Sequence, residues 1–185
     1  MDTNEVKQIL DREIQELIAD FRQNPNVFLT EEDIRCHLFS RILGNELFSE
    51  LQATATEGSR SIPIHSEVRW YGRNGKLKYR SDLVILETSD LQTRNSLELP
   101  SKGYGFNTFH AVVEIKLRRV RGDTNNVYAR KIREDQEKTL ELMREVDNLN
   151  AQHYLLCFDK KSDISTLLPA LEGTPRLTRS YVFQP

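Results

Sequence analysis

VVEIKL, residues 112–117, and YRSDLV, residues 79–84, are the two stretches that decide the fold of this chain. Both contain apolar runs of the kind found in the middle of a sheet. Asp82 interrupts one stretch and Glu114 and Lys116 interrupt the other, although isolated ions are expensive to bury. Because strand side chains alternate, Glu114 and Lys116 point to one face and the apolar residues between them to the other. The charged face is therefore a candidate functional site.

If the two strands are neighbours, Asp82 can lie opposite Glu114. Two carboxylates with no cation between them repel each other unless one is protonated or a metal bridges them. Oxygen ligands suit a hard divalent ion, Mg²⁺ or Mn²⁺, which keeps several waters and also accepts phosphate oxygens. Lys116 can then orient a metal-bound water or help to deprotonate it. A metal site with an adjacent lysine has the groups that phosphodiester hydrolysis needs. The alternative is structural: Glu114 and Lys116 form a salt bridge at a sheet edge, and Asp82 merely ends a turn.

The flanking sequence predicts a mixed α/β fold with the element order ααβββαβ. Apolar periodicity predicts helices over residues 4–22, from the N-cap Thr30 to Gly44, and over residues 130–146. Alternation and apolar runs predict strands over residues 64–71, 77–86, 109–117 and 154–158, with an Asn-Gly hairpin turn at residues 74–75. A helix before the last of these strands permits a parallel crossover in a sheet that begins antiparallel.

Three finer expectations concern side-chain faces and the remaining segments. Ile64, Val68 and Trp70 are expected on one side of their strand, and Ile132, Gln136, Leu140 and Met143 on the inward stripe of their helix. Residues 52–62 and 87–108 have no clear period and are expected to be loops, the second long enough to face a substrate or another subunit. The tail, residues 161–185, can add a small helix and an edge strand.

Length and composition indicate a single domain, residues 1–185, with a core over residues 30–160. Hydrophobic residues make up 38% of the chain, and no stretch approaches the roughly 20 apolar residues of a membrane helix. The acidic start does not resemble a signal peptide, so we expect a cytoplasmic protein with no membrane partner. The phosphate-binding motifs GxxxxGK[ST] and GxGxxG are both absent, which excludes the usual nucleotide-binding routes.

Charge is distributed unevenly along a chain whose formal net charge is -2. Residues 1–58 carry 5 basic and 12 acidic side chains, residues 59–133 carry 15 and 7, and residues 134–185 carry 6 and 9. Two basic runs, residues 69–80 and 116–133, can line one groove that binds phosphates. The alternative is two charged edges exposed to solvent.

Taken together, these features resemble the PD-(D/E)xK nuclease superfamily over residues 30–160. The evidence is Asp82 one strand before Glu114-Ile115-Lys116, a helix upstream that opens with Glu31-Glu32, the hairpin, and a helix-strand unit downstream. The resemblance implies a restriction-endonuclease-like core, a mixed sheet flanked by helices, and Mg²⁺-dependent (or Mn²⁺-dependent) endonuclease activity on DNA. Ser81 stands where the superfamily has proline. This departure affects the expected backbone path into the strand more than the expected metal ligands and catalytic residues.

The resemblance also implies roles for individual residues. Asp82, Glu114 and the backbone carbonyl of Ile115 would hold the metal, and Lys116 would act at the attacking water. An acid on the upstream helix would support the metal, directly or through water, with Glu31 the first choice and Glu32 the second.

DNA contacts are expected from residues of the basic runs and the last helix. They are Arg69, Arg73, Lys78, Arg80, Arg118, Lys131 and Gln136. Gln136 resembles a glutamine that some branches place near the active site, and it can equally be a polar residue at the helix margin. A homodimer is plausible because cutting both strands needs two sites. The competing hypothesis is a nuclease-fold module that binds nucleic acid or assembles without cutting.

Overall fold

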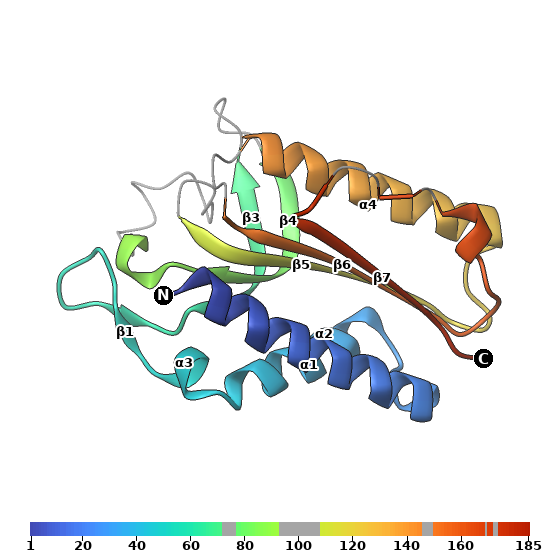
Figure 1. Ribbon diagram of the computed structural model, residues 1–185, viewed down its shortest axis with the longest axis horizontal. Helices are drawn as coiled ribbons and strands as arrows, with labels where there is room; N and C mark the ends of the chain where they lie inside the picture. The colour runs from blue at the N-terminus through green and yellow to red at the C-terminus, as the bar shows by residue number, and fades with distance from the viewer. Residues whose placement is uncertain (72–76, 93–107, 146–149, 169, 172–173) are drawn as a thin grey trace.

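A mixed five-stranded sheet forms the centre of the computed structural model, and helices cover both of its faces (Figure 1). The structure describes residues 1–71, 77–92, 108–145, 150–168, 170–171 and 174–185. The strand order is β3 (Ile64–Tyr71), β4 (Leu77–Leu86), β5 (Phe109–Arg118), β6 (Gln152–Asp159) and β7 (Leu177–Phe183). Neighbours from β3 to β5 are antiparallel, and those from β5 to β7 are parallel. The α/β class and the change from antiparallel to parallel pairing are confirmed.

The helices form the outer layers of the protein. They are α1 (Thr3–Gln23), α2 (Glu31–Leu43), the single turn α3 (Glu46–Ser49), α4 (Asn125–Glu145) and the 3₁₀ turns η1 (Pro25–Val27), η2 (Thr88–Asp90) and η3 (Ser165–Leu167). A short ribbon of β1 (Gln52–Ala53) and β2 (Arg60–Ser61) occupies the predicted loop at residues 52–62. The tail adds η3 and the edge strand β7, as expected. No helix among the described residues has both the length and the apolar character of a membrane span.

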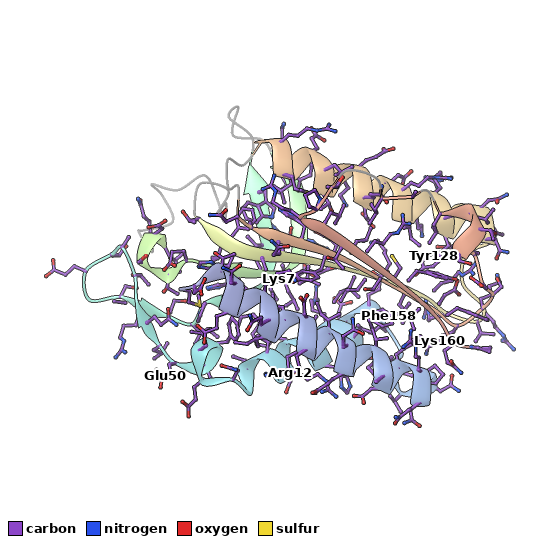
Figure 2. The ribbon with its side chains drawn as sticks, viewed as in Figure 1. Lys7, Arg12, Glu50, Tyr128, Phe158 and Lys160 are labelled. Carbon is purple, nitrogen blue, oxygen red and sulfur yellow. The ribbon has the colours of Figure 1, made fainter. Side chains whose placement is uncertain are left out.

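Helices α1 and α2 share one hydrophobic core with the inner residues of the sheet. Phe21 of α1 packs against Phe158 of β6, with ring centroids 4.8 Å apart, and also against Phe28. Figure 2 shows Phe158 in the filled space between the sheet and α1. Burial of these large side chains fixes α2 beneath the centre of the sheet, next to β4 and β5.

A capping box fixes the first turn of α2. The Thr30 hydroxyl accepts a bond from the Asp33 N–H at 3.1 Å, and the Asp33 carboxylate accepts one from the Thr30 N–H at 3.0 Å. Both bonds satisfy N–H groups that a helix start leaves open. Glu31 follows Thr30 directly, so the cap also determines where its side chain projects.

On the other face, α4 (Asn125–Glu145) is longer than predicted. It begins at Asn125, and its buried residues are Tyr128, Ala129, Ile132, Asp135, Thr139 and Leu142. Of the predicted inward stripe, Ile132 is fully buried, Leu140 and Met143 are half-buried against the core, and Gln136 is half-buried and bonds to Arg179 of β7. Because Asp135 and Thr139 are polar, hydrophobicity alone did not predict that they are buried.

The β3–β4 hairpin changes face at Glu67, which has a positive φ of 57°. Ile64, before it, packs with the core that faces α1 and α2, whereas Val68 and Trp70 pack with Leu142 of α4. The prediction that Ile64, Val68 and Trp70 share one side was therefore wrong, because the left-handed residue interrupts the alternation of side chains. A non-glycine residue in this region is strained and needs support from its surroundings.

A buried ion pair joins the ends of β5 and β6. Nε of Arg118 lies 2.9 Å from the Asp159 carboxylate, both side chains have no exposed surface, and the guanidinium also bonds to Asn125 at 2.8 Å. The Tyr128 ring lies 5.0 Å from the guanidinium carbon. This cluster ties the start of α4 to the strand ends next to the candidate site.

We expect Arg118→Met to lower the free energy of unfolding by roughly 3–5 kcal/mol, because it leaves the Asp159 carboxylate buried without its cation. The exposed neighbour is the control: Arg119→Met should change stability by no more than about 0.5 kcal/mol. Chemical denaturation followed by circular dichroism measures both. Equal losses in the two variants would contradict a structural role for the buried pair.

Candidate functional site

One pocket, of about 380 Å³, brings together the four residues predicted to be catalytic. Asp82 of β4, Glu114 and Lys116 of β5 and Glu31 of α2 all line it. The sheet register explains the first contact: Leu83 pairs with Val113, so the next positions along the two strands are Asp82 and Glu114. The capped first turn of α2 adds Glu31 from the adjacent layer.

The Glu114 carboxyl lies where its charge is unfavourable. Burial and the nearby charge of Asp82 raise its pKa to about 8, partly offset by Lys138 and by a hydrogen bond with the Ser81 hydroxyl. Without a bound cation, Glu114 is therefore mostly protonated at neutral pH. The predicted conflict between the two carboxylates is present in the structure.

Asp82 occupies the point where β4 and β5 stop pairing. The described pairing runs from Leu86–Phe109 to Leu83–Val113, and beyond it the Asp82 Oδ2 accepts the Ile115 N–H at 2.7 Å. Its Oδ1 lies 3.4 Å from Nη1 of Arg35. The same guanidinium contacts Glu67, which lies level with Asp82 in the β3–β4 register. Arg35 thus supports both the metal-ligand candidate and the strained residue beside it.

The ammonium group of Lys116 is paired with an acid of α4. Its Nζ lies 3.0 Å from the Asp135 Oδ2, and among the described residues no ion pair joins it to Glu114. Burial alone would lower its pKa, but the carboxylates of Asp135, Glu31 and Asp82 raise it overall. Lys116 therefore remains protonated near neutral pH, which suits it to orient a water or a phosphate oxygen and not to remove a proton. The alternative of a Glu114–Lys116 salt bridge was wrong.

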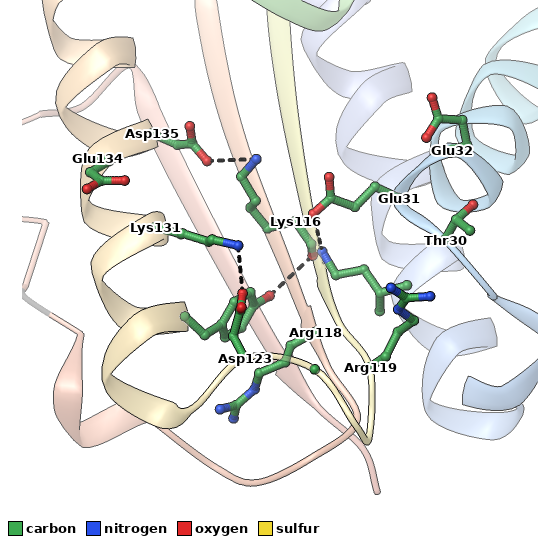
Figure 3. A pocket seen from close by; sticks show the side chains of 13 residues that line it. Thr30, Glu31, Glu32, Lys116, Arg118, Arg119, Asp123, Lys131, Glu134 and Asp135 are labelled. Atoms are coloured by element: carbon green, nitrogen blue, oxygen red, sulfur yellow. Dashed lines mark hydrogen bonds and ion pairs between the residues drawn. The ribbon is translucent and has the colours of Figure 1, made fainter.

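A second pocket, of about 550 Å³, is shown in Figure 3. It shares Glu31 and Lys116 with the first pocket. Glu31 accepts the Leu117 N–H at 3.1 Å and so bridges α2 and β5. Glu32 lines only the larger pocket and pairs with Arg35 at 2.8 Å. Of the two acids considered on α2, Glu31 is the one that reaches the site.

The expected nucleic-acid contacts on the hairpin lie partly in the smaller pocket. Lys78 and Arg80 line it, and Arg80 pairs with Glu67 at 2.8 Å. Arg69 stands opposite Arg80 on β3. Arg73, like the predicted turn at residues 74–75, lies outside the described residues.

The contacts expected from the second basic run are mostly engaged with protein. Arg118 is buried in its pair with Asp159, so the structure speaks against a role for it in binding nucleic acid. Lys131 lines the larger pocket and pairs with Asp123 at 2.8 Å. Gln136 accepts a hydrogen bond from Arg179 of β7 at 2.8 Å and lines neither pocket.

Sequence reasoning missed Asp135, Lys138 and the role of Ser81. Asp135 is spaced by three residues from Ile132 and by seven from Tyr128, which is the pattern of one helix face, but an acid is not expected there. Ser81 is fully buried, and its hydroxyl accepts the Trp70 indole N–H at 2.9 Å. Serine thus fixes the strand entry with hydrogen bonds at the position where proline was expected.

The donor atoms fit a hard divalent cation. Among the described residues no three His, Cys, Asp or Glu side chains form a cluster that could hold a metal ion. Two carboxylates, Asp82 and Glu114, still suit Mg²⁺, which keeps several water ligands and uses one or two protein carboxylates. The carbonyl of Ile115 as a third ligand stays a prediction.

Comparisons of the chain with protein-family models, curated proteins and solved structures found no match. The residues of the two pockets therefore carry the functional assignment by themselves.

We expect the metal-free protein to lose stability through Glu114 as pH rises. Its pKa is about 8 in the folded chain and near 4.5 when unfolded, so the folded state binds the extra proton between these values. The stabilisation of the folded state that comes from protonated Glu114 is fully present below pH 4.5 and is lost as pH rises to about 8. The free energy of unfolding falls by at most about 1.4 kcal/mol per pH unit over this range. Glu114→Gln should remove this slope.

Unfolding free energies in EDTA at several pH values between 5 and 8 measure the effect. Glu137→Gln, at an exposed position of α4, is the control and should keep the wild-type slope. Parallel curves for Glu114→Gln and wild type would show that Glu114 is ionised in the folded protein.

Proposed function

We propose that this protein is a metal-dependent nuclease that hydrolyses DNA phosphodiester bonds through a site of the PD-(D/E)xK type. The observation that carries the proposal is the pocket shared by Asp82, Glu114, Lys116 and Glu31. Further support comes from the mixed sheet, with an antiparallel hairpin before the site and a parallel crossover through α4 after it. This arrangement is consistent with a restriction-endonuclease-like core.

Asp82 and Glu114 would hold Mg²⁺ or Mn²⁺, with Glu31 supporting it through water. The metal would supply a Lewis acid for the phosphoryl oxygen and lower the pKa of a bound water. Burial and the repulsion from Asp82 both favour the protonated form of Glu114, and a cation bound between the two carboxylates would offset both effects.

The chain's own residues have separate tasks in the hydrolysis. The water oxygen forms a bond to phosphorus and gives up its proton to solvent, while the bond from phosphorus to the leaving sugar oxygen breaks and that oxygen takes a proton from solvent. Lys116, kept protonated by Asp135 and Glu31, orients the water and stabilises charge on the phosphoryl oxygens. Lys78 and Arg80 at the pocket wall attract the phosphate backbone.

We expect Mg²⁺-dependent cleavage of DNA that falls by about 100-fold or more in Asp82→Asn, Glu114→Gln and Lys116→Met, because each removes a charge at the reacting phosphate. Gel assays on duplex, branched and single-stranded DNA, with RNA beside them, measure the rate and identify the substrate form. Glu137→Gln is again the exposed control, and circular dichroism checks that each variant is folded. Undiminished cleavage in the three site variants would refute the assignment.

A nuclease-fold module that binds nucleic acid or assembles without cutting is the second candidate. The observation that favours it is that both carboxylate oxygens of Asp82 already have protein partners, Ile115 and Arg35. A module of this kind would bind DNA in a salt-sensitive manner, indifferent both to Mg²⁺ and to Asp82→Asn. Fluorescence anisotropy with and without the metal separates the two candidates.

A further inference from the structure

Asp135 is a buried acid with two cationic partners, one on the sheet and one on its own helix. Its side chain is 7% exposed, and such a carboxylate is stable only when it is paired. Nζ of Lys116 lies 3.0 Å from one of its oxygens, and Nζ of Lys138 lies 2.7 Å from the other. Lys116 alone would be enough to neutralise it. The second lysine therefore calls for an explanation beyond helix packing.

Lys138 belongs to the same pocket as the proposed metal ligands. It lines this pocket with Asp82 and Glu114, and its charge acts on Glu114. Its side chain is 45% exposed, so it reaches the pocket from the solvent side. An ammonium group has three donors, and the bond to Asp135 uses one of them. Lys138 is thus both held by the protein and accessible to a ligand.

The charges of the pocket suit an anionic ligand in the presence of a cation. Its lining contains four basic residues, Lys78, Arg80, Lys116 and Lys138, and three acids, Glu31, Asp82 and Glu114. A divalent cation at these three acids would reduce their negative charge and so favour the approach of a phosphodiester to the basic residues, of which Lys116 and Lys138 share the single carboxylate of Asp135.

We propose that Lys138 binds a non-bridging oxygen of the scissile phosphodiester, and that Asp135 is the positioning residue that holds Lys116 and Lys138 at the pocket. This inference rests on the nuclease function proposed above. Lys138 touches the substrate and Asp135 acts through the two lysines.

Lys138→Met tests the direct contact. It should lower kcat/KM by about tenfold to a hundredfold and make the dependence of log Kd on log salt less steep by about 0.7 to 0.9, since one phosphate contact is lost. Lys138→Arg should restore most of the activity. Arg144→Met, an exposed residue at the far end of α4, removes the same charge and should leave kcat/KM and the salt slope unchanged.

Asp135→Asn tests the positioning role. It should lower kcat about tenfold or more with little change in KM, because the lysines remain but are no longer held in place. In the Lys116→Met, Lys138→Met background the same substitution should have no further effect on kcat, since both of its partners are gone. Thermal melting checks that each variant is folded. Lys138 is half exposed, so Lys138→Met decides the proposal even if Asp135→Asn does not fold.

The outcomes separate the two proposals. If wild type does not cleave, or if Glu114→Gln cleaves equally well, the nuclease function fails. If wild type and Glu114→Gln behave as expected while Lys138→Met matches Arg144→Met, only the inference about Lys138 is overturned. Full additivity of Asp135→Asn with the double lysine variant would overturn the positioning role alone.

Discussion

The balance of charge around the Asp82 carboxylate is the constraint on which the rest of the site depends. This side chain stands where β4 and β5 separate, and it replaces a backbone partner by accepting the Ile115 N–H. It is then level with Glu114, whose pKa rises through burial and this neighbouring charge. Arg35 approaches the half-buried Asp82 from α2, and the charge of Lys116 on β5 also acts on it, so charges from three elements meet at this carboxylate.

The predicted fold agrees with the structure where hydrophobic patterns are strong. The bounds of β3 and β4 match the prediction, β5 and β6 extend it by one to three residues, and the N-cap at Thr30 is present. That Asp82, Glu114 and Lys116 line one pocket could be predicted. Side chains alternate between the two faces of a strand, so pairing the two strands leaves few other positions for these three side chains. The roles of these residues in catalysis are a proposal that experiment has to decide.

The features that the sequence did not predict depend on tertiary contacts between polar groups. The buried face of α4 contains Asp135 and Thr139, which hydrophobicity places outside, and only the lysines that meet Asp135 explain its position. The reversal at Glu67 needs a left-handed residue that Arg35 and Arg80 hold through its carboxylate. Arg118 looked like a surface cation because Asp159, its partner, lies 41 residues later in the chain.

Two adjoining pockets share the side chains of Glu31 and Lys116, and this arrangement matters for inhibition. A small molecule seated in the larger pocket would touch both residues without competing for the carboxylates of Asp82 and Glu114. Compounds that chelate an active-site metal tend to act on many unrelated metalloenzymes, whereas the walls of the larger pocket include Thr30, Arg119 and Asp123, which take no part in the proposed metal site. Selective ligands are therefore better sought beside the proposed metal centre than upon it.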